Sequence, residues 1–173
     1  ALLGAIYYLE EKGYTFQNFA GTSAGAIVSS LLAVGYTGKE LKEMLLNIKF
    51  TDFYEKNKLS LLPFIGPTIS LFKNKGLFSG NNIEEYLNKL YKAKGKHKFK
   101  DIAVNGKSPL KVIASDVTNK KLLVLPDDLK NYNIDPLEFE IAKAVRMSLS
   151  IPFFFNPVIL NKNENPSYIV DGG

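Results

Sequence analysis

The segment Gly21-Thr22-Ser23-Ala24-Gly25 limits the possible folds of this chain more than any other feature of its sequence. Residues 15–20 before it are short, β-prone and bounded by glycine, which predicts a strand, whereas residues 23–34 after it are small, apolar and helix-compatible. The chain must therefore turn from a strand into a helix within very few residues. Serine with glycine at −2 and +2 in that context fits a nucleophile elbow, because glycine removes Cβ atoms that would clash in so sharp a turn. The alternative is a turn of small residues in which Ser23 only caps the helix.

Helical and strand patterns alternate along most of the sequence. Further helices are predicted from Leu2 to a stop at Gly13, over 37–47, from a cap at Ser79 through Tyr91, and over 135–148, and further strands over 110–114, 121–125 and 168–170. Residues 50–78 are apolar and aromatic but have no clean period. This order favours an α/β layered fold with a largely parallel sheet, built as a single domain over residues 1–173.

The composition excludes several kinds of chemistry. The chain has no cysteine and one histidine, so disulfides, zinc–thiolate sites, a thiol nucleophile and a multi-histidine metal site are all ruled out. We expect neither a metal nor a cofactor. No apolar run approaches the ~18 residues that a membrane span requires. The net charge of +5 comes almost entirely from lysine.

A nucleophilic serine needs a base, and two residues are candidates. His97 is flanked by lysines in Lys96-His97-Lys98, outside any apolar element, and we interpret it as a solvated surface residue. Asp171 ends the predicted strand over 168–170 and precedes two glycines. Functional residues gather at the carboxyl ends of parallel strands, so the sheet could bring Asp171 and Ser23 to one edge. Taken alone, Asp171 also fits a common Asp-Gly turn.

Several blocks of the sequence, in order, resemble the patatin-like phospholipases. Gly21 to Ala26 with Asp171-Gly172-Gly173 far downstream is the core of the match. The supporting blocks are the first helix around Ala1-Leu2-Leu3-Gly4-Ala5, Gly76-Leu77-Phe78-Ser79-Gly80, Ile113-Ala114-Ser115-Asp116-Val117-Thr118, and Ala144-Val145-Arg146-Met147-Ser148-Leu149-Ser150-Ile151-Pro152-Phe153. The resemblance spans essentially the whole chain. Met147 and Ser115 stand where the family usually has alanine and threonine.

The resemblance implies a three-layer α/β/α sandwich and a lipid acyl hydrolase that works through a Ser–Asp dyad. Ser23 would be the nucleophile that forms an acyl-enzyme and Asp171 the base, with no metal. Gly21, Ala24 and Gly25 would form the elbow and support the oxyanion, and Gly172 would shape the turn beside Asp171. The family's Gly-rich oxyanion loop precedes its first helix, and this sequence starts inside that helix. We therefore expect a segment of a longer protein, in which the Ala24 N–H supplies one oxyanion donor.

Two rival functions remain open from the sequence. One is a Ser–His acyltransferase or hydrolase that uses His97, and the other is an inactive lipid- or protein-binding module on the same scaffold. The expected partner is a phospholipid or another acyl-ester lipid. Apolar residues 59–78 flanked by Lys58, Lys73 and Lys75 suit a peripheral contact with a lipid interface, although a core segment explains them equally well. The lysine-rich stretch 92–100 is interpreted as a solvated link rather than a nucleic-acid site, and a cytoplasmic or peripheral membrane location is expected.

Overall fold

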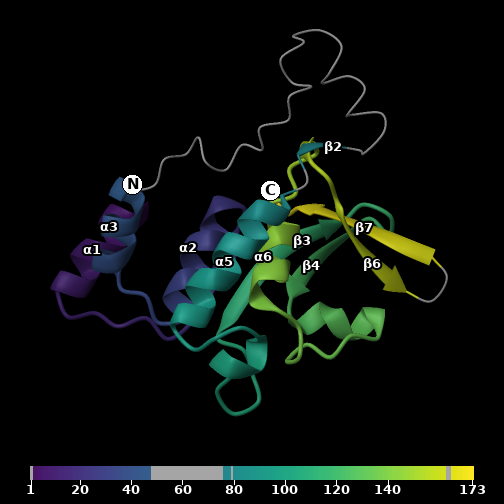
Figure 1. Ribbon diagram of the computed structural model, residues 1–173. Coiled ribbons are helices and arrows are strands. Elements are labelled where there is room, and N and C mark those ends of the chain that lie inside the picture. The colour runs from purple at the N-terminus through teal and green to yellow at the C-terminus, as the bar shows by residue number, and fades with distance from the viewer. Residues whose placement is uncertain (1, 48–75, 79, 163–164) are drawn as a thin grey trace, which may run out of the picture.

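The computed structural model describes residues 2–47, 76–78, 80–162 and 165–173 (Figure 1). Its helices are α1 (Leu2–Glu11), α2 (Ala24–Ala33), α3 (Gly38–Asn47), α5 (Asn81–Ala93) and α6 (Ile141–Ser148), with 3-10 helices η3 (Phe99–Ile102) and η4 (Asp127–Tyr132). Its strands are β1 (Phe19–Thr22), β2 (Gly76–Phe78), β3 (Leu110–Asp116), β4 (Lys121–Leu125), β5 (Phe153–Phe155), β6 (Val158–Lys162) and β7 (Asn165–Asp171). The apolar stretch over 59–75 and its lysines fall outside the described residues, as does Ser79.

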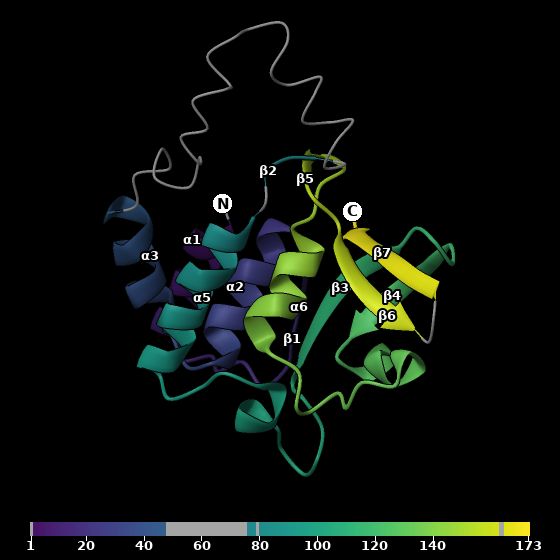
Figure 2. The same ribbon diagram turned by 45° about the vertical axis from the view of Figure 1, so that its right-hand side comes forward.

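Helices lie on both sides of a mixed sheet, which confirms the predicted α/β/α fold class. Helices α2 and α6 pack against the sheet, where α2 contacts β1 and β3 and α6 contacts β3 and β7, and α5 packs against α6 (Figures 1 and 2). On the other side, η4 contacts β4 and β6. Helix α1 packs against α3, farther from the sheet.

The sheet is less parallel than the sequence predicts. In the described part of this sheet, β1 pairs with β3 in the parallel sense, whereas β4 and β7 are antiparallel to β3 and β6 is antiparallel to β7. The separate pair β2–β5 is parallel. The prediction of a largely parallel sheet is therefore wrong within the described residues. β4 follows β3 through a short turn and β7 follows β6 after two residues, and such short connections favour antiparallel pairing.

The register of β3 places β1 and β7 end to end. β4 pairs with residues 112–116 along one edge of β3. β1 pairs with residues 110–113 and β7 with residues 114–116, so both must lie along the opposite edge. They run toward each other, and Thr22 ends β1 opposite Ile113 while Asp171 ends β7 opposite Ala114. Ser23 and Asp171 thus come from two strands that meet at the middle of β3.

The core alternates along β3 in the way that a half-covered strand requires. Leu110, Val112 and Ala114 are fully buried, and they belong to one apolar cluster with Ala144 and Val145 of α6. Along α6 every residue except Lys143 is buried, so this short helix runs through the interior rather than over the surface. The packing of α6 on β3 and β7 brings its C-terminal turn to the junction of β1 and β7.

The predicted helix over 135–148 begins only at Ile141. The N–H groups of Phe99 and Lys100 donate to the carbonyls of Phe139 and Leu137, and Lys98 forms an isolated bridge with Glu140. These contacts use backbone groups of 137–140 that a helix would need for itself. The capping pattern at Asp135 instead forms a local turn, in which the Leu137 N–H donates to the Asp135 carboxylate.

Candidate active site

The turn at Ser23 has the strained geometry of a nucleophile elbow. Ser23 lies between β1 and α2 with φ 51° and ψ −127°, a backbone conformation that non-glycine residues rarely adopt. A Cβ added to Gly21 would lie 2.4 Å from the backbone of Gly25, so glycine is required there by the close approach of strand end and helix start. A Cβ on Gly25 would meet nothing within 4 Å. The predicted steric need for glycine is therefore confirmed at −2 and wrong at +2.

Asp171 lies beside the elbow with one carboxylate oxygen available. Its side chain is buried, its own N–H donates to the carbonyl of Ser150, and its Oδ1 accepts from the Gly173 N–H at 2.8 Å. Its Oδ2 is buried and has no hydrogen-bond partner among the described residues. A buried acceptor without a partner costs free energy, and such groups concentrate at functional sites.

Gly172 lets the chain turn away from β3 beside Asp171. A Cβ at this position would lie 2.7 Å from the Ile113 carbonyl oxygen. The close contact holds the end of β7 against the middle of β3, where β1 also ends. Glycine is therefore required at position 172 by its close approach to the Ile113 carbonyl.

A direct hydrogen bond between the Ser23 hydroxyl and the Asp171 carboxylate is not formed in the part of the chain that the structure describes. Thr22, which precedes Ser23, and Asp171 end their strands opposite consecutive residues of β3, which are about 3.3 Å apart along the strand. Catalytic hydrogen bonds are often long before substrate binds. The strand register thus brings the backbones of Ser23 and Asp171 to neighbouring positions along β3.

The first turn of α2 offers backbone donors next to Ser23. The Ser23 carbonyl accepts from the Ala26 N–H, which starts the helix directly after the serine. The N–H groups of a helix's first turn lack intrahelical acceptors and carry the positive end of the helix dipole, so they favour an anion. The Ser23 N–H itself is used, because it donates to the Ser148 hydroxyl at 2.9 Å. The N–H groups of Ala24 and Gly25 are therefore the candidate donors of this turn for an anion.

Ser148 was not singled out as a functional residue in the sequence analysis. It ends α6, is fully buried, and contacts both the elbow and β3. The signal that could have found it is a small polar residue on a helix whose neighbours Val145 and Met147 are wholly apolar. A buried hydroxyl must find hydrogen-bond partners, which indicates a contact with backbone elsewhere.

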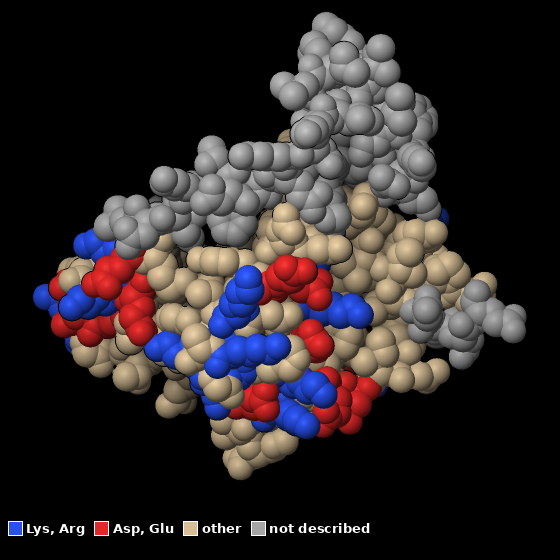
Figure 3. All heavy atoms as spheres, in the orientation of Figure 1, with Lys and Arg blue, Asp and Glu red and all other residues tan. Residues whose placement is uncertain are grey.

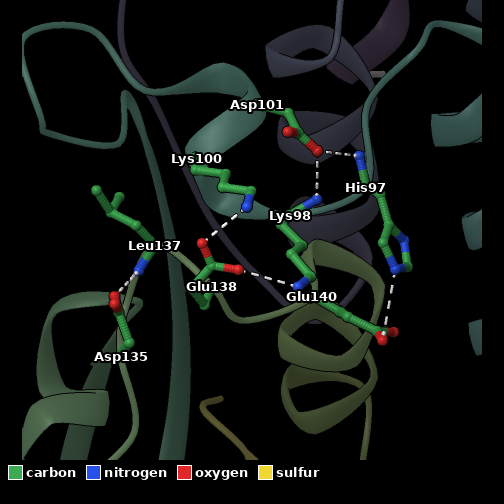
Figure 4. A network of polar contacts seen from close by, with 8 residues as sticks. All are labelled: His97, Lys98, Lys100, Asp101, Asp135, Leu137, Glu138 and Glu140. Carbon is green, nitrogen blue, oxygen red and sulfur yellow. Dashed lines mark hydrogen bonds and ion pairs between the residues drawn. The ribbon is translucent and has the colours of Figure 1, made fainter.

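His97 lies far from the elbow, in a network at the opposite end of α6 (Figure 4). Its Nδ1 is 3.1 Å from the Asn88 Oδ1, its Nε2 is 3.5 Å from the Glu140 carboxylate, and its carbonyl accepts from the Ile141 N–H. Since α6 has eight residues, its two ends are about 12 Å apart. Ser23 is bonded at the far end, so His97 cannot take the proton of its hydroxyl.

The link that contains His97 is more structured than predicted. The Asp101 carboxylate accepts from the N–H groups of His97 and Lys98, each at 2.8 Å, and the Lys98 bond is the main reason that the pKa of Asp101 is lowered. Phe99 is fully buried beneath it. Residues 98–102 are therefore docked against the fold, and the prediction of a solvated link over 92–100 is wrong for residues 98–100.

Charges of both signs alternate on the face seen in Figure 3. Glu138 binds Lys98 and Lys100, and Glu40 binds Lys94, at distances of 2.7 to 3.0 Å. Lys94, Lys98 and Lys100 are thus each paired with a glutamate. Among the described residues, no cluster of three potential ligands could hold a metal ion, and no helix combines the length and apolarity of a membrane span.

Three comparisons place the chain among known proteins. The sequence model of the family described as Patatin-like phospholipase matches residues 1–173. The uncharacterized protein YqhO of Bacillus subtilis (strain 168) is 42% identical over 174 residues, which cover 100% of this chain and 58% of that protein. The probable lipid hydrolase 463L of Invertebrate iridescent virus 6 is 31% identical, over 99% of this chain and 54% of that protein. The chain thus spans little more than half the length of these relatives.

The fold has a counterpart among solved structures. The crystal structure of VipD from Legionella pneumophila superposes with a TM-score of 0.56 and 18% sequence identity, over 99% of this chain and 43% of that chain. That likeness concerns the fold. The family match covers the whole sequence, and a relative with 42% identity extends along its full length. The chain belongs to the patatin-like phospholipase family.

Proposed function

We propose that the chain is the catalytic part of a lipid acyl hydrolase that cleaves acyl esters through an acyl-enzyme on Ser23, with Asp171 as the base. The observation that supports this most is the meeting of β1 and β7 at the middle of β3, which brings a strained serine beside a buried carboxylate oxygen that has no partner among the described residues. The name of the viral relative, a probable lipid hydrolase, and the family itself support a lipid substrate.

The proposed cycle needs only these groups and water. Asp171 Oδ2 accepts the proton of the Ser23 hydroxyl while the oxygen attacks the ester carbonyl. The tetrahedral oxyanion is stabilised by backbone N–H groups at the start of α2, of which Ala24 is the first after the nucleophile. Collapse transfers the proton from Asp171 to the leaving alcohol or lysolipid and leaves an acyl-Ser23. Water gives a proton to Asp171 and attacks the acyl group, and collapse of this second tetrahedral intermediate returns that proton from Asp171 to the Ser23 oxygen as the fatty acid leaves.

Electrostatic stabilisation must contribute much of the acceleration, because a carboxylate is a weak base toward an alcohol. One oxyanion donor is typically worth about 3–4 kcal/mol of the barrier. The Ser23 N–H is already bonded to Ser148, so the donors come from Ala24 and from groups outside the elbow. Gly25 supports the same turn without a steric requirement of its own.

Contact with a lipid interface is part of the proposal. Ile151, Phe153 and Phe154 are 41%, 73% and 51% exposed and follow Ser150, whose carbonyl holds the Asp171 N–H. Phe153 adopts a positive φ of 69°, a costly conformation for an exposed aromatic residue. Apolar side chains displayed beside the proposed site would suit acyl chains at the surface of a membrane or lipid aggregate.

The rival that uses His97 finds no support in its position, since both ring nitrogens face other residues at the far end of α6. The test uses the full-length protein, a fluorophosphonate probe and p-nitrophenyl butyrate. Ser23→Ala should remove labelling and lower turnover by at least about 10³-fold, whereas His97→Ala should keep both. An unlabelled wild-type protein without turnover would favour an inactive binding module, and loss of turnover in His97→Ala alone would favour the Ser–His enzyme.

A further inference from the structure

Ser148 joins the nucleophile elbow to the central strand through one buried hydroxyl. Its Oγ accepts from the Ser23 N–H at 2.9 Å and donates to the Ile113 carbonyl at 2.6 Å. The side chain is fully buried, and 125 residues separate it from Ser23 in sequence. The hydroxyl therefore uses both its donor and an acceptor position on backbone groups of two different elements.

The Ile113 carbonyl lies where the segments that carry the two members of the proposed dyad meet. It also accepts from the Thr22 hydroxyl at 3.4 Å, immediately before the nucleophile. On the side of Asp171, the same oxygen lies only 2.7 Å from where a Cβ of Gly172 would stand. A movement of this carbonyl would thus displace the segments that carry Ser23 and Asp171.

The C-terminal turn of α6 reaches both segments at once. Two residues after Ser148, the Ser150 carbonyl accepts from the Asp171 N–H at 3.0 Å. The Ser150 hydroxyl is in turn bonded to the buried guanidinium of Arg146 and donates to its carbonyl. This turn is consequently fixed by its own hydrogen bonds, independently of its contacts with the two members of the dyad.

A backbone in the conformation of Ser23 persists only where its surroundings over-determine it. The carbonyl of Ser23 accepts the first bond of α2, which fixes the residue from its C-terminal side. The N–H of Ser23 is fixed by Ser148 alone among the described residues. Without that hydroxyl, the peptide between Thr22 and Ser23 could rotate toward an unstrained turn.

We propose that Ser148 is a positioning residue that holds Ser23 in its strained conformation and sets it against the strand position opposite Asp171. Its effect on turnover rests on the proposed function, whereas its effect on the backbone of Ser23 does not. The same bond removes the Ser23 N–H from the oxyanion hole. Ser148 touches no substrate and acts only through the geometry of Ser23.

The experiment compares Ser148→Ala with Ser30→Ala in the full-length protein. Ser30 is equally buried, and its hydroxyl bonds to the Tyr91 hydroxyl and the Ile27 carbonyl. Ser30→Ala therefore also removes a buried hydroxyl with two partners, but neither partner is Ser23. Turnover of p-nitrophenyl butyrate is measured per fluorophosphonate-titrated site, which separates misplacement from loss of folded protein. Amide hydrogen exchange of Ser23 is measured in parallel as a readout that needs no activity.

In Ser148→Ala, kcat per titrated site should fall about 10- to 100-fold with KM nearly unchanged, and the Ser23 amide should exchange at least about 10-fold faster while the β3 amides keep their protection. Ser30→Ala should change neither.

Unchanged Ser23 exchange, or an unchanged kcat per site, would overturn the proposal. If wild type has no turnover, the proposed function fails, and Ser23 exchange still decides whether Ser148 positions the residue. Should Ser148→Ala not fold, Ser148→Cys fills the space with a weakly bonding sulfur and carries the same expectations.

Discussion

Asp116 and Asp171 are both buried carboxylates at the ends of strands that pair with each other, yet their surroundings differ in kind. Asp116 ends β3 and is 1% exposed, and both its oxygens accept hydrogen bonds, from the Asn119 N–H, the Asn119 amide and the Tyr132 hydroxyl at 2.6 to 3.0 Å. Asp171 ends β7 and is 9% exposed, with a single bond to Oδ1 from the neighbouring Gly173. Its Oδ2 is left without a partner among the described residues.

Hydrogen-bond partners separate a structural carboxylate from one that is available for chemistry. Burial works to raise the pKa of Asp116, but hydrogen bonds from Asn119, Tyr132 and Ser167 outweigh it and hold that pKa below its ordinary value. Burial of the ring, together with the hydrogen bond to Asp116, raises the pKa of Tyr132. A carboxylate with a full set of donors stabilises the fold, whereas one that keeps a free acceptor oxygen can receive a proton from a neighbour.

The largest expected effect is the loss of turnover in Asp171→Asn. An amide cannot take the Ser23 proton, so ester hydrolysis in the full-length protein should fall by about 10²–10⁴-fold. The free energy of unfolding should change by less than about 1 kcal/mol, because only one short hydrogen bond is at stake. Initial rates with a short-chain ester and urea unfolding give the two numbers. Near-normal turnover would remove Asp171 from the mechanism and with it the contrast between the two aspartates.

A smaller loss should follow from moving Asp171 without changing its chemistry. In Gly172→Ala, the new Cβ would lie 2.7 Å from the Ile113 carbonyl oxygen, so the end of β7 must shift. A displacement of that size should lower turnover about 10- to 100-fold. Gly4→Ala is the matched control, since a Cβ there meets nothing within 4 Å. Equal rates for wild type and Gly172→Ala would mean that the position of Asp171 is not critical.

The elbow could be predicted from sequence because its signals are local. The glycine spacing around Ser23, the capping pair of Thr37 and Glu40 and the turn between β3 and β4 all act over a few residues, and the structure has each of them. The strand before the elbow runs over Phe19–Thr22 rather than 15–20, because pairing with β3 sets its bounds. The three-layer α/β/α arrangement was predicted from the resemblance to a family and not from local patterns.

The relation between Ser23 and Asp171 could not be derived from local signals. The sequence argument placed both residues at one edge of a parallel sheet, but β7 runs against β3 and meets β1 end to end. Strand direction depends on pairing across more than 50 residues, which no short pattern encodes. The contact of Ser148 with Ser23 depends in turn on where α6 crosses that junction.

Asp116→Asn should reverse the pattern expected for Asp171→Asn. Replacing a carboxylate that accepts three bonds leaves buried donors unpaired, which should cost about 1–3 kcal/mol of unfolding free energy at neutral pH. Turnover per folded molecule should stay close to wild type. Unfolding by urea, followed alongside ester turnover, separates the two effects. A stable variant with little activity would assign Asp116 to the site and break the comparison.

The pH dependence of that loss sharpens the prediction. A folded-state pKa below the ordinary value of about 3.9 means that the contribution of Asp116 is fully present above that pH and is lost as pH falls through the lowered pKa. The gap in stability between wild type and Asp116→Asn should therefore be constant from neutral pH down to about pH 5 and shrink below pH 4. A gap that widened in acid would contradict the lowered pKa.

The smallest effect is expected at an exposed carboxylate, Glu138, which extends the comparison to the surface. Its oxygens accept from Lys98 at 3.0 Å and from Lys100 at 2.7 Å, and the Lys100 bond is the first reason that its pKa is lowered. All three side chains are at least one-third exposed, so water and salt screen the pairs and the loss of both is largely compensated by hydration.

Glu138→Gln should leave the unfolding midpoint and turnover within error of wild type, at low salt and at 0.5 M salt alike. The measurement is a thermal unfolding series in both buffers, with Asp116→Asn beside it as the buried reference. A loss in Glu138→Gln as large as in Asp116→Asn would show that hydrogen-bond number alone, and not burial, decides what a carboxylate contributes to this fold.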